Sequence, residues 1–268
     1  MKKLGFIGAG KMAGAIIGGV LAKGLADTSD IGVYDILPEQ TALLEQKGCK
    51  AYATIRELVS DCEIVFLSVK PQVFPTLAED LKVSAKPESL FVSIMAGISA
   101  ESIKQAVGFD CKVILVMPNT PLLLGQGAAA LARVEPTTPA EFEAVRSLFA
   151  AAGVAEEISP DKMREVIPVN GSSPAFVYRF AQTLITSAIK AGISEEAAKS
   201  LVIQTLIGSA HMLRDTESSP QELIDMVCSP GGTTLAAMKA LEDNGFSHAI
   251  EQAFAACVHR AEELACGE

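Results

Sequence analysis

Leu4-Gly5-Phe6-Ile7-Gly8-Ala9-Gly10-Lys11-Met12-Ala13 is the stretch that decides the fold of this 268-residue chain. A short apolar run breaks at glycines and then continues at helical spacing, which predicts a buried strand, a tight turn and a helix. Gly8 allows the turn, Gly10 lets a ligand approach the backbone, and Ala13 lets the helix pack on the strand. The free N–H groups at such a helix start bind anions. The stretch therefore predicts a dinucleotide-binding loop; a plain glycine-rich turn is the alternative.

Strand-like apolar runs alternate with helical patterns over the first part of the chain. The runs lie at 31–35, 64–69, 90–94, 113–117, 127–131 and 154–158. Continuous apolar runs are typical of strands that are buried on both faces. The alternation predicts an α/β fold, a doubly wound and mainly parallel sheet over residues 1–159. The strand ends carry Gly, Pro, Asn or Ser, which suits a cofactor lying along the sheet edge.

Residues 160–268 have helical periodicity and no strand-like runs, which predicts a second, all-helical domain. We expect a long helix over 160–191, interrupted at Gly171–Pro174, and a helix capped by Ser194 that reaches about Arg214. Several of these helices are apolar on more than one face. We therefore expect a homodimer or a multiple of dimers.

Composition excludes several classes of protein. A net charge of −10 argues against nucleic acid as a partner, since phosphate binding needs a basic face. We expect no membrane partner and a cytoplasmic location, because no apolar run approaches the length of a membrane span and no signal peptide precedes the first strand. Six cysteines without C-x-x-C spacing predict reduced thiols, and three isolated histidines predict no metal site.

Two features suggest how ligands bind. Asp35 ends the second strand, where an acid commonly accepts hydrogen bonds from the adenosine ribose; ordinary turn chemistry is the alternative. By its charge alone, Asp35 favours NAD(H) over NADP(H), because a carboxylate repels the 2′-phosphate of NADP(H). The stretch Ser229-Pro230-Gly231-Gly232-Thr233-Thr234 precedes a helix and offers free N–H groups to a carboxylate. The alternative is a plain helix start capped by Ser229.

The second domain lacks an evident general base. Dehydrogenases that oxidise an alcohol need one, usually His or Lys. The lysines of this domain lie in polar contexts, and we expect His211 to have no carboxylate partner. A cyclic imine fits better, because its carbon is already activated and the site need only position it, clamp its carboxylate and donate a hydrogen bond.

Five motifs resemble those of the pyrroline-5-carboxylate reductases over the whole chain. They are Gly8-Ala9-Gly10-Lys11-Met12, Val69-Lys70-Pro71, Met117-Pro118-Asn119-Thr120-Pro121, Gly171-Ser172-Ser173-Pro174-Ala175 and Ser229–Thr234. The resemblance implies a Rossmann-like domain followed by a helical dimerisation domain. It also implies reduction of 1-pyrroline-5-carboxylate to L-proline, with NADP(H) favoured as cofactor and NAD(H) as the second choice. Ser173 departs from the glycine that is usual in this family.

The resemblance, together with the glycine loop and Asp35, assigns residues to the site. The expected cofactor-binding residues are Ile7, Gly8, Ala9, Gly10, Lys11, Met12, Asp35, Ser68, Val69, Lys70, Pro71, Met95, Ala96, Gly97, Pro118 and Asn119. The expected substrate-binding residues are Glu217, Ser229, Gly231, Gly232, Thr233 and Thr234, with Thr234 catalytic. For Glu217, a solvated loop residue is the alternative.

Two other functions remain open. A hydroxyacid dehydrogenase would need a Lys or His on the long helix, where residues 163–180 offer only Arg164 and Arg179. A dinucleotide sensor would bind the cofactor but turn over no imine.

Overall fold

The computed structural model describes residues 3–266, and the chain forms two compact units. Of the described residues, unit 1 comprises 3–174 and 257–266, and unit 2 comprises 175–256. The division into domains after residue 159 stays a prediction.

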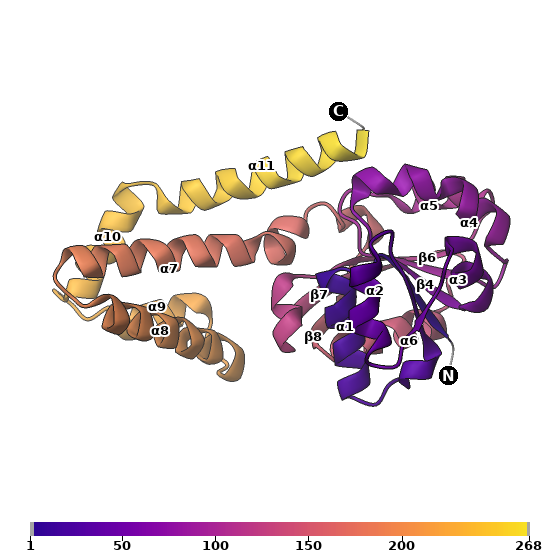
Figure 1. The fold of residues 1–268 in the computed structure, drawn as a ribbon. Coiled ribbons are helices and arrows are strands. Elements are labelled where there is room, and N and C mark those ends of the chain that lie inside the picture. Colours follow the sequence, from indigo (N-terminus) through magenta and orange to yellow (C-terminus); the bar gives the residue numbers. More distant parts are fainter. Residues whose placement is uncertain (1–2, 267–268) are drawn as a thin grey trace. The chain divides into compact units, whose positions relative to one another are not determined.

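Unit 1 contains an eight-stranded sheet in the order β3-β2-β1-β4-β5-β6-β7-β8 (Figure 1). All neighbours are parallel except β6 and β7, which are antiparallel. The predicted α/β sheet is thus confirmed. Because β1 lies between β2 and β4, the strand order reverses at β1, the place where such sheets bind ligands. The strands are β1 Leu4–Ile7, β2 Ile31–Tyr34, β3 Lys50–Ala51, β4 Ile64–Leu67, β5 Leu90–Ser93, β6 Lys112–Met117, β7 Gly127–Val134 and β8 Gly153–Glu157.

Helices cover both faces of the sheet. Residues of α1, α2 and α6 share one buried cluster with the sheet, and residues of α3, α4 and α5 share the other. In the first cluster the rings of Phe6 and Phe66 stack with their centroids 4.3 Å apart. These helices are α1 Lys11–Ala22, α2 Pro38–Glu45, α3 Ile55–Asp61, α4 Ala78–Ser84, α5 Ala100–Val107 and α6 Pro139–Ala150.

Side-chain caps begin several helices, as their sequences predict. Ser99 caps α5, and Thr138 with Glu141 forms a capping box on α6. In both cases the side-chain oxygen accepts a hydrogen bond from an N–H group of the first turn. The helix starts of the candidate site, described below, have no such side-chain cap.

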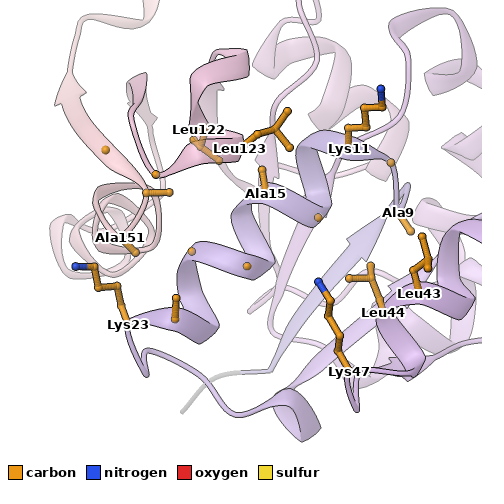
Figure 2. A pocket seen from close by; sticks show the side chains of 18 of the residues that line it. Ala9, Lys11, Ala15, Lys23, Leu43, Leu44, Lys47, Leu122, Leu123 and Ala151 are labelled. Atoms are coloured by element: carbon orange, nitrogen blue, oxygen red, sulfur yellow. The ribbon is translucent and has the colours of Figure 1, made fainter. Parts of the chain in front are cut away.

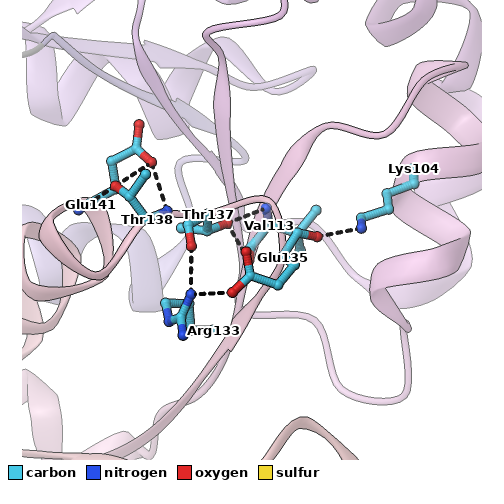
Figure 3. A network of polar contacts seen from close by, with 7 residues as sticks. All are labelled: Lys104, Val113, Arg133, Glu135, Thr137, Thr138 and Glu141. Carbon is cyan, nitrogen blue, oxygen red and sulfur yellow. Dashed lines mark hydrogen bonds and ion pairs between the residues drawn. The ribbon is translucent and has the colours of Figure 1, made fainter.

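A polar network fastens the amino end of β6 to the turn after β7 (Figure 3). The fully buried Thr137 hydroxyl donates to the Val113 carbonyl at 3.0 Å and accepts from its N–H at 2.9 Å. Arg133 donates to the Glu135 carboxylate and to the Thr137 carbonyl, and Lys104 donates to the Glu135 carbonyl. These bonds satisfy backbone groups at the end of the β6–β7 ladder.

From Ser173 on, the described part of the chain consists of helices joined by short loops. The helices of this part of the chain are α7 Ser173–Lys190, α8 Glu195–Asp215, α9 Pro220–Val227, α10 Thr233–Asp243 and α11 Phe246–Cys266. Ser194 caps α8 as predicted. The long helix expected over 160–191 is wrong in its first part: a 3₁₀ turn at Pro160–Lys162 and a π turn at Ile167–Gly171 precede α7. Prolines at the start of each turn supply no N–H for a regular helix.

Unit 2 leaves large apolar side chains exposed. They include Val177, Phe180, Leu184, Leu201 and Ile207. Such a surface is typical of a helical interface that another chain covers. Among the described residues, no helix is both long and apolar enough to cross a bilayer.

Candidate active site

The glycine loop after β1 has a backbone that only glycine fits. Gly8 has a positive φ of 96°, and its N–H donates to the Tyr34 carbonyl at 2.8 Å. A Cβ atom at Gly8 would lie 2.6 Å from the Ser68 carbonyl oxygen. The loop therefore passes close to the ends of both β2 and β4, and any side chain at Gly8 would push it away.

Side chains from the two neighbouring strands hold this loop. The Asp35 carboxylate accepts from the N–H groups of Ala9 at 2.8 Å and Leu37 at 3.0 Å. The Ser68 hydroxyl lies 2.8 Å from the Gly8 carbonyl oxygen and 3.0 Å from that of Ile7, either of which accepts its hydrogen. Two of the expected cofactor residues thus shape the loop itself. The bonds prearrange it before any ligand arrives.

The start of α1 is open to an anion. Its N-cap is Gly10, which provides no side-chain cap, and the first turn contains no acidic residue. The first helical hydrogen bond runs from Gly14 N–H to Gly10, so the N–H groups between them have no partner within the helix. A Cβ atom at Gly10 would meet nothing within 4 Å. This start fits a pyrophosphate group.

A groove of about 850 Å³ begins at this loop and follows the outer face of α1 (Figure 2). Ala9, Gly10 and Lys11 line its first part. The rest is lined by small residues of α1, by α2, and by the segments around Leu122 and Ala151. Only the first part coincides with the expected cofactor residues.

The other expected cofactor residues follow the carboxyl ends of β4, β5 and β6. They are Val69, Lys70 and Pro71, then Met95, Ala96 and Gly97, then Pro118 and Asn119. Because β1, β4, β5 and β6 are neighbouring parallel strands, these segments lie at the same edge of the sheet as the glycine loop, which follows β1. A cavity of about 330 Å³ lies at this edge, with Met95, Gly97, Met117 and Arg164 in its lining.

Two asparagines fix the end of β6, and sequence reasoning missed one of them. The Asn119 Oδ1 accepts from the Ala128 N–H at 2.9 Å. The Asn170 Nδ2 donates to the carbonyls of Met117 at 2.7 Å and Ala128 at 2.9 Å. No local pattern marks Asn170, because its partners are 53 and 42 residues away in sequence.

The expected substrate loop lies in unit 2 at the start of α10. The N-cap is Gly232, again without a side-chain cap. The alternative that Ser229 caps this helix is therefore wrong. The Gly232 N–H donates to the Ser229 carbonyl at 2.9 Å, so, against expectation, this N–H is not free. The N–H groups of Thr233, Thr234 and Leu235 remain for a carboxylate, because helical bonding begins at Ala236.

A groove of about 750 Å³ lies beside this loop, between α9 and α10. Gly231, Gly232 and Cys228 contribute to its lining. Thr234 is half-buried in the first turn of α10, and Glu217 is exposed between α8 and α9. The structure thus brings the two glycines to a groove and leaves Glu217 in a solvated loop.

One expectation about the general base is wrong. His211 has a carboxylate partner, since its Nδ1 lies 3.2 Å from Asp215 Oδ2 one helical turn later. Hydrogen bonds from Arg214, and then from His211, lower the pKa of the Asp215 carboxyl to about 2. All three side chains are exposed on α8. The three side chains form a polar cluster on the surface of α8.

The lysines of this region are also paired or exposed. Lys162 bonds to Glu165 and Lys239 to Asp243, both in exposed ion pairs. Within residues 3–266, no group of three or more His, Cys, Asp or Glu side chains could hold a metal ion.

Comparison with known protein families covers both parts of the chain. Residues 160–264 match the family described as pyrroline-5-carboxylate reductase dimerisation. Residues 3–97 match the family described as NADP oxidoreductase coenzyme F420-dependent. The first of these accounts for the helical region and the second for the glycine loop and the first part of the sheet.

Relatives that match over nearly their full length carry the same family name. The chain is 37% identical over 264 residues to the pyrroline-5-carboxylate reductase of Escherichia coli, with 98% of each chain covered. It is 38% identical over 265 residues to that of Pseudomonas aeruginosa, covering 98% of this chain and 97% of the relative.

Solved structures share the fold over nearly the whole chain. The pyrroline-5-carboxylate reductase of Coxiella burnetii gives a TM-score of 0.91 at 30% identity, and the pyrroline carboxylate reductase of Plasmodium falciparum, solved with NADP bound, gives 0.89 at 28% identity. Both comparisons cover 98% of each chain. The chain therefore belongs to the pyrroline-5-carboxylate reductase family.

Proposed function

We propose that this chain reduces 1-pyrroline-5-carboxylate to L-proline, the last step of proline biosynthesis, with a nicotinamide dinucleotide as reductant. Beyond family membership, one observation carries the proposal. Both α1 and α10 begin at a glycine N-cap with no side-chain cap and no acidic residue in the first turn. Ser or Thr caps α5, α6, α8 and α9, and α2 and α4, which also lack a side-chain cap, have acidic residues in the first turn. The two open helix starts suit the two anionic groups of the reaction, the pyrophosphate of the cofactor and the carboxylate of the substrate.

The cofactor of the proposal is NADP(H), with NAD(H) as the alternative. When bound, it supplies the hydride. The start of α1 would hold the pyrophosphate, and the segments after β4, β5 and β6 would line the rest of the dinucleotide. NADP is favoured by the resemblance and by the Plasmodium relative solved with it. The Asp35 carboxylate would favour NAD(H) only if its charge, now shared with two backbone N–H groups, faces the ribose.

The substrate needs little acid–base help from the chain. Its protonated C=N group is electrophilic: a hydride bonds to the carbon, and the π electrons become the lone pair on nitrogen. The N–H groups of Thr233, Thr234 and Leu235 would hold the carboxylate. The Thr234 hydroxyl would bond near the ring nitrogen. Holding the imine in a reactive orientation is then the main contribution of these residues.

The active assembly of the proposal is a homodimer or a multiple of dimers. The dimerisation family matches residues 160–264, and the same region exposes the apolar side chains of α7 and α8. A second copy of the chain is the partner that would cover them.

Loss of reduced-cofactor absorbance on addition of 1-pyrroline-5-carboxylate tests the proposal. NADPH and NADH are assayed in parallel. We expect rapid loss with NADPH and slower loss with NADH. Tight binding of a cofactor without any loss would leave the sensor as the better function, and faster loss with NADH would reverse the cofactor choice.

A further inference from the structure

The side chain of Asn170 donates hydrogen bonds to two backbone carbonyls at the point where the backbone pairing of β6 with β7 ends. Met117 is the last residue of β6 and pairs with Ala130 of β7. The next residue, Pro118, has no N–H group and cannot continue the ladder. Both peptide groups of Ala128, which lies beyond this last pair, have no partner in the ladder, and the Met117 carbonyl is the last one on β6. Asn170 binds the two carbonyls, and Asn119 binds the Ala128 N–H.

The orientation of the Asn170 amide follows from its surroundings. Both of its neighbours are carbonyl oxygens, so the NH₂ group must face them. Asn170 is only 8% exposed, and within the described part of the chain no donor reaches its buried Oδ1. Burying an unpaired acceptor is unfavourable, and an apolar side chain of the same size would avoid it. The two N–H donors are therefore the reason for an asparagine at this position.

The backbone that Asn170 binds leads into the part of the sheet edge where the nicotinamide half of a dinucleotide would lie, because Asp35, the expected contact of the adenosine ribose, follows β2 on one side of β1 and β6 lies on the other side. Pro118 and Asn119 directly follow Met117. Met117 also packs in a small buried cluster with Ile167, and Ala96, an expected cofactor residue after β5, packs against that cluster. The loop for the pyrophosphate follows β1, which β4 and β5 separate from β6.

We propose that Asn170 is a positioning residue for the nicotinamide end of the dinucleotide, acting through the backbone of Met117 and Ala128. The inference rests on the proposed function, because it assumes that a dinucleotide binds at this edge. It predicts that loss of Asn170 weakens binding of the nicotinamide half and leaves the adenosine half unaffected.

The test compares two ligands on two variants of the full-length protein. Asn170→Leu keeps the size of the side chain and removes both donors. Thr137→Val removes a buried hydroxyl at the other end of β6, where Thr137 binds Val113, and is the matched control. Dissociation constants are measured for NADPH, from its fluorescence, and for 2′,5′-ADP, which contains only the adenosine half.

For Asn170→Leu we expect the NADPH dissociation constant to rise about fivefold to tenfold, as for the loss of one or two hydrogen bonds, with 2′,5′-ADP unchanged. Thr137→Val should change neither constant, even if it lowers the melting temperature. Equal weakening of both ligands by Asn170→Leu, or no change in either, would overturn the inference.

A second variant and the wild-type protein distinguish failure of the inference about Asn170 from failure of the proposed function. If Asn170→Leu does not fold, Asn170→Ser, which retains one shorter donor, is measured in the same way and must weaken NADPH binding selectively. If wild-type protein binds neither NADPH nor NADH, the proposed function itself fails. If it binds them and the Asn170 variants do not discriminate between the two ligands, only the role of Asn170 fails.

Discussion

The Asp35 carboxylate accepts a hydrogen bond from the Ala9 backbone N–H at 2.8 Å, which ties the end of β2 to the glycine loop after β1. Its second oxygen accepts from Leu37 at 3.0 Å. Asp35 thus shapes the loop whether or not it also meets the ribose. We expect Asp35→Ala to raise the dissociation constants of NADPH and NADH alike, by about tenfold or more, because the loop loses a charge-assisted bond.

Asp35→Asn separates the two roles of this carboxylate. The amide keeps one acceptor oxygen but no charge. If Asp35 acts only on the loop, NADPH and NADH binding should weaken in the same proportion. A selective gain in NADPH affinity would show instead that the charge repels the 2′-phosphate. Asp27→Asn, at an exposed residue outside the site, is the control and should bind both as the wild type does.

Two glycines of α1 have no packing reason to be glycine. A Cβ atom at Gly14 or Gly18 would meet nothing within 4 Å, whereas one at Gly19 would lie 2.8 Å from the Ala152 Cβ. We expect Gly14→Ala and Gly18→Ala each to raise the free energy of unfolding by about 0.5–1 kcal/mol, since alanine restricts the unfolded chain and favours a helix. Gly19→Ala should lower it.

Urea unfolding of the three variants checks this prediction, and cofactor affinity is measured beside it. An unchanged or lower stability of Gly14→Ala and Gly18→Ala would contradict it. Unchanged affinity is expected, because both residues lie farther along α1 than its N-cap Gly10, where the pyrophosphate would bind.

The features that could be predicted from sequence depend on neighbouring residues. The glycine loop, the Ser99 and Ser194 caps and the Thr138 capping box each need contacts only a few positions away. The His211–Asp215 pair is also local, four residues apart on one helix. The prediction that His211 has no carboxylate partner was wrong, although this spacing indicates such a pair.

The features that could not be predicted depend on distant contacts. The antiparallel direction of β7 is set by pairing, and its apolar run does not encode a direction. The role of Asn170 arises from carbonyls on β6 and β7, and that of Asp35 from the loop after β1. The stretch 160–171 contains helical periodicity, yet prolines and the packing of Ile167 on Met117 give it turns instead.

The Lys112–Glu141 pair should make stability depend on pH in the acid range. Its atoms are 2.6 Å apart and the side chains are 23% and 14% exposed. Burial raises the pKa of the Glu141 carboxyl, but hydrogen bonds from Lys112 and Thr138 outweigh it and lower the pKa from 4.5 to about 2. Because the folded value is the lower one, this contribution is complete above pH 4.5 and is lost as the pH falls toward 2.

Glu141→Gln should therefore lower the free energy of unfolding by roughly 2–3 kcal/mol near neutral pH, and the two proteins should converge as the pH approaches 2. Urea unfolding between these pH values measures the difference. Glu143→Gln, which removes an exposed pair with Arg146, is the control and should have little effect. A difference for Glu141→Gln that does not vary with pH would contradict the prediction.

The Thr234 hydroxyl distinguishes a reductase from a protein that only binds the dinucleotide. Thr234 lies in the first turn of α10, among the N–H groups that would hold the substrate carboxylate, while the loop for the cofactor follows β1. We expect Thr234→Ala to lower kcat/KM for 1-pyrroline-5-carboxylate by about tenfold to a hundredfold, since a donor near the reacting nitrogen is lost, with NADPH affinity unchanged. Thr205→Ala removes a hydroxyl that bonds to its own helix, at the Leu201 carbonyl, and should leave both quantities as they are. Unchanged turnover in Thr234→Ala would remove the hydroxyl from the mechanism and leave the backbone of α10 as the group that orients the imine.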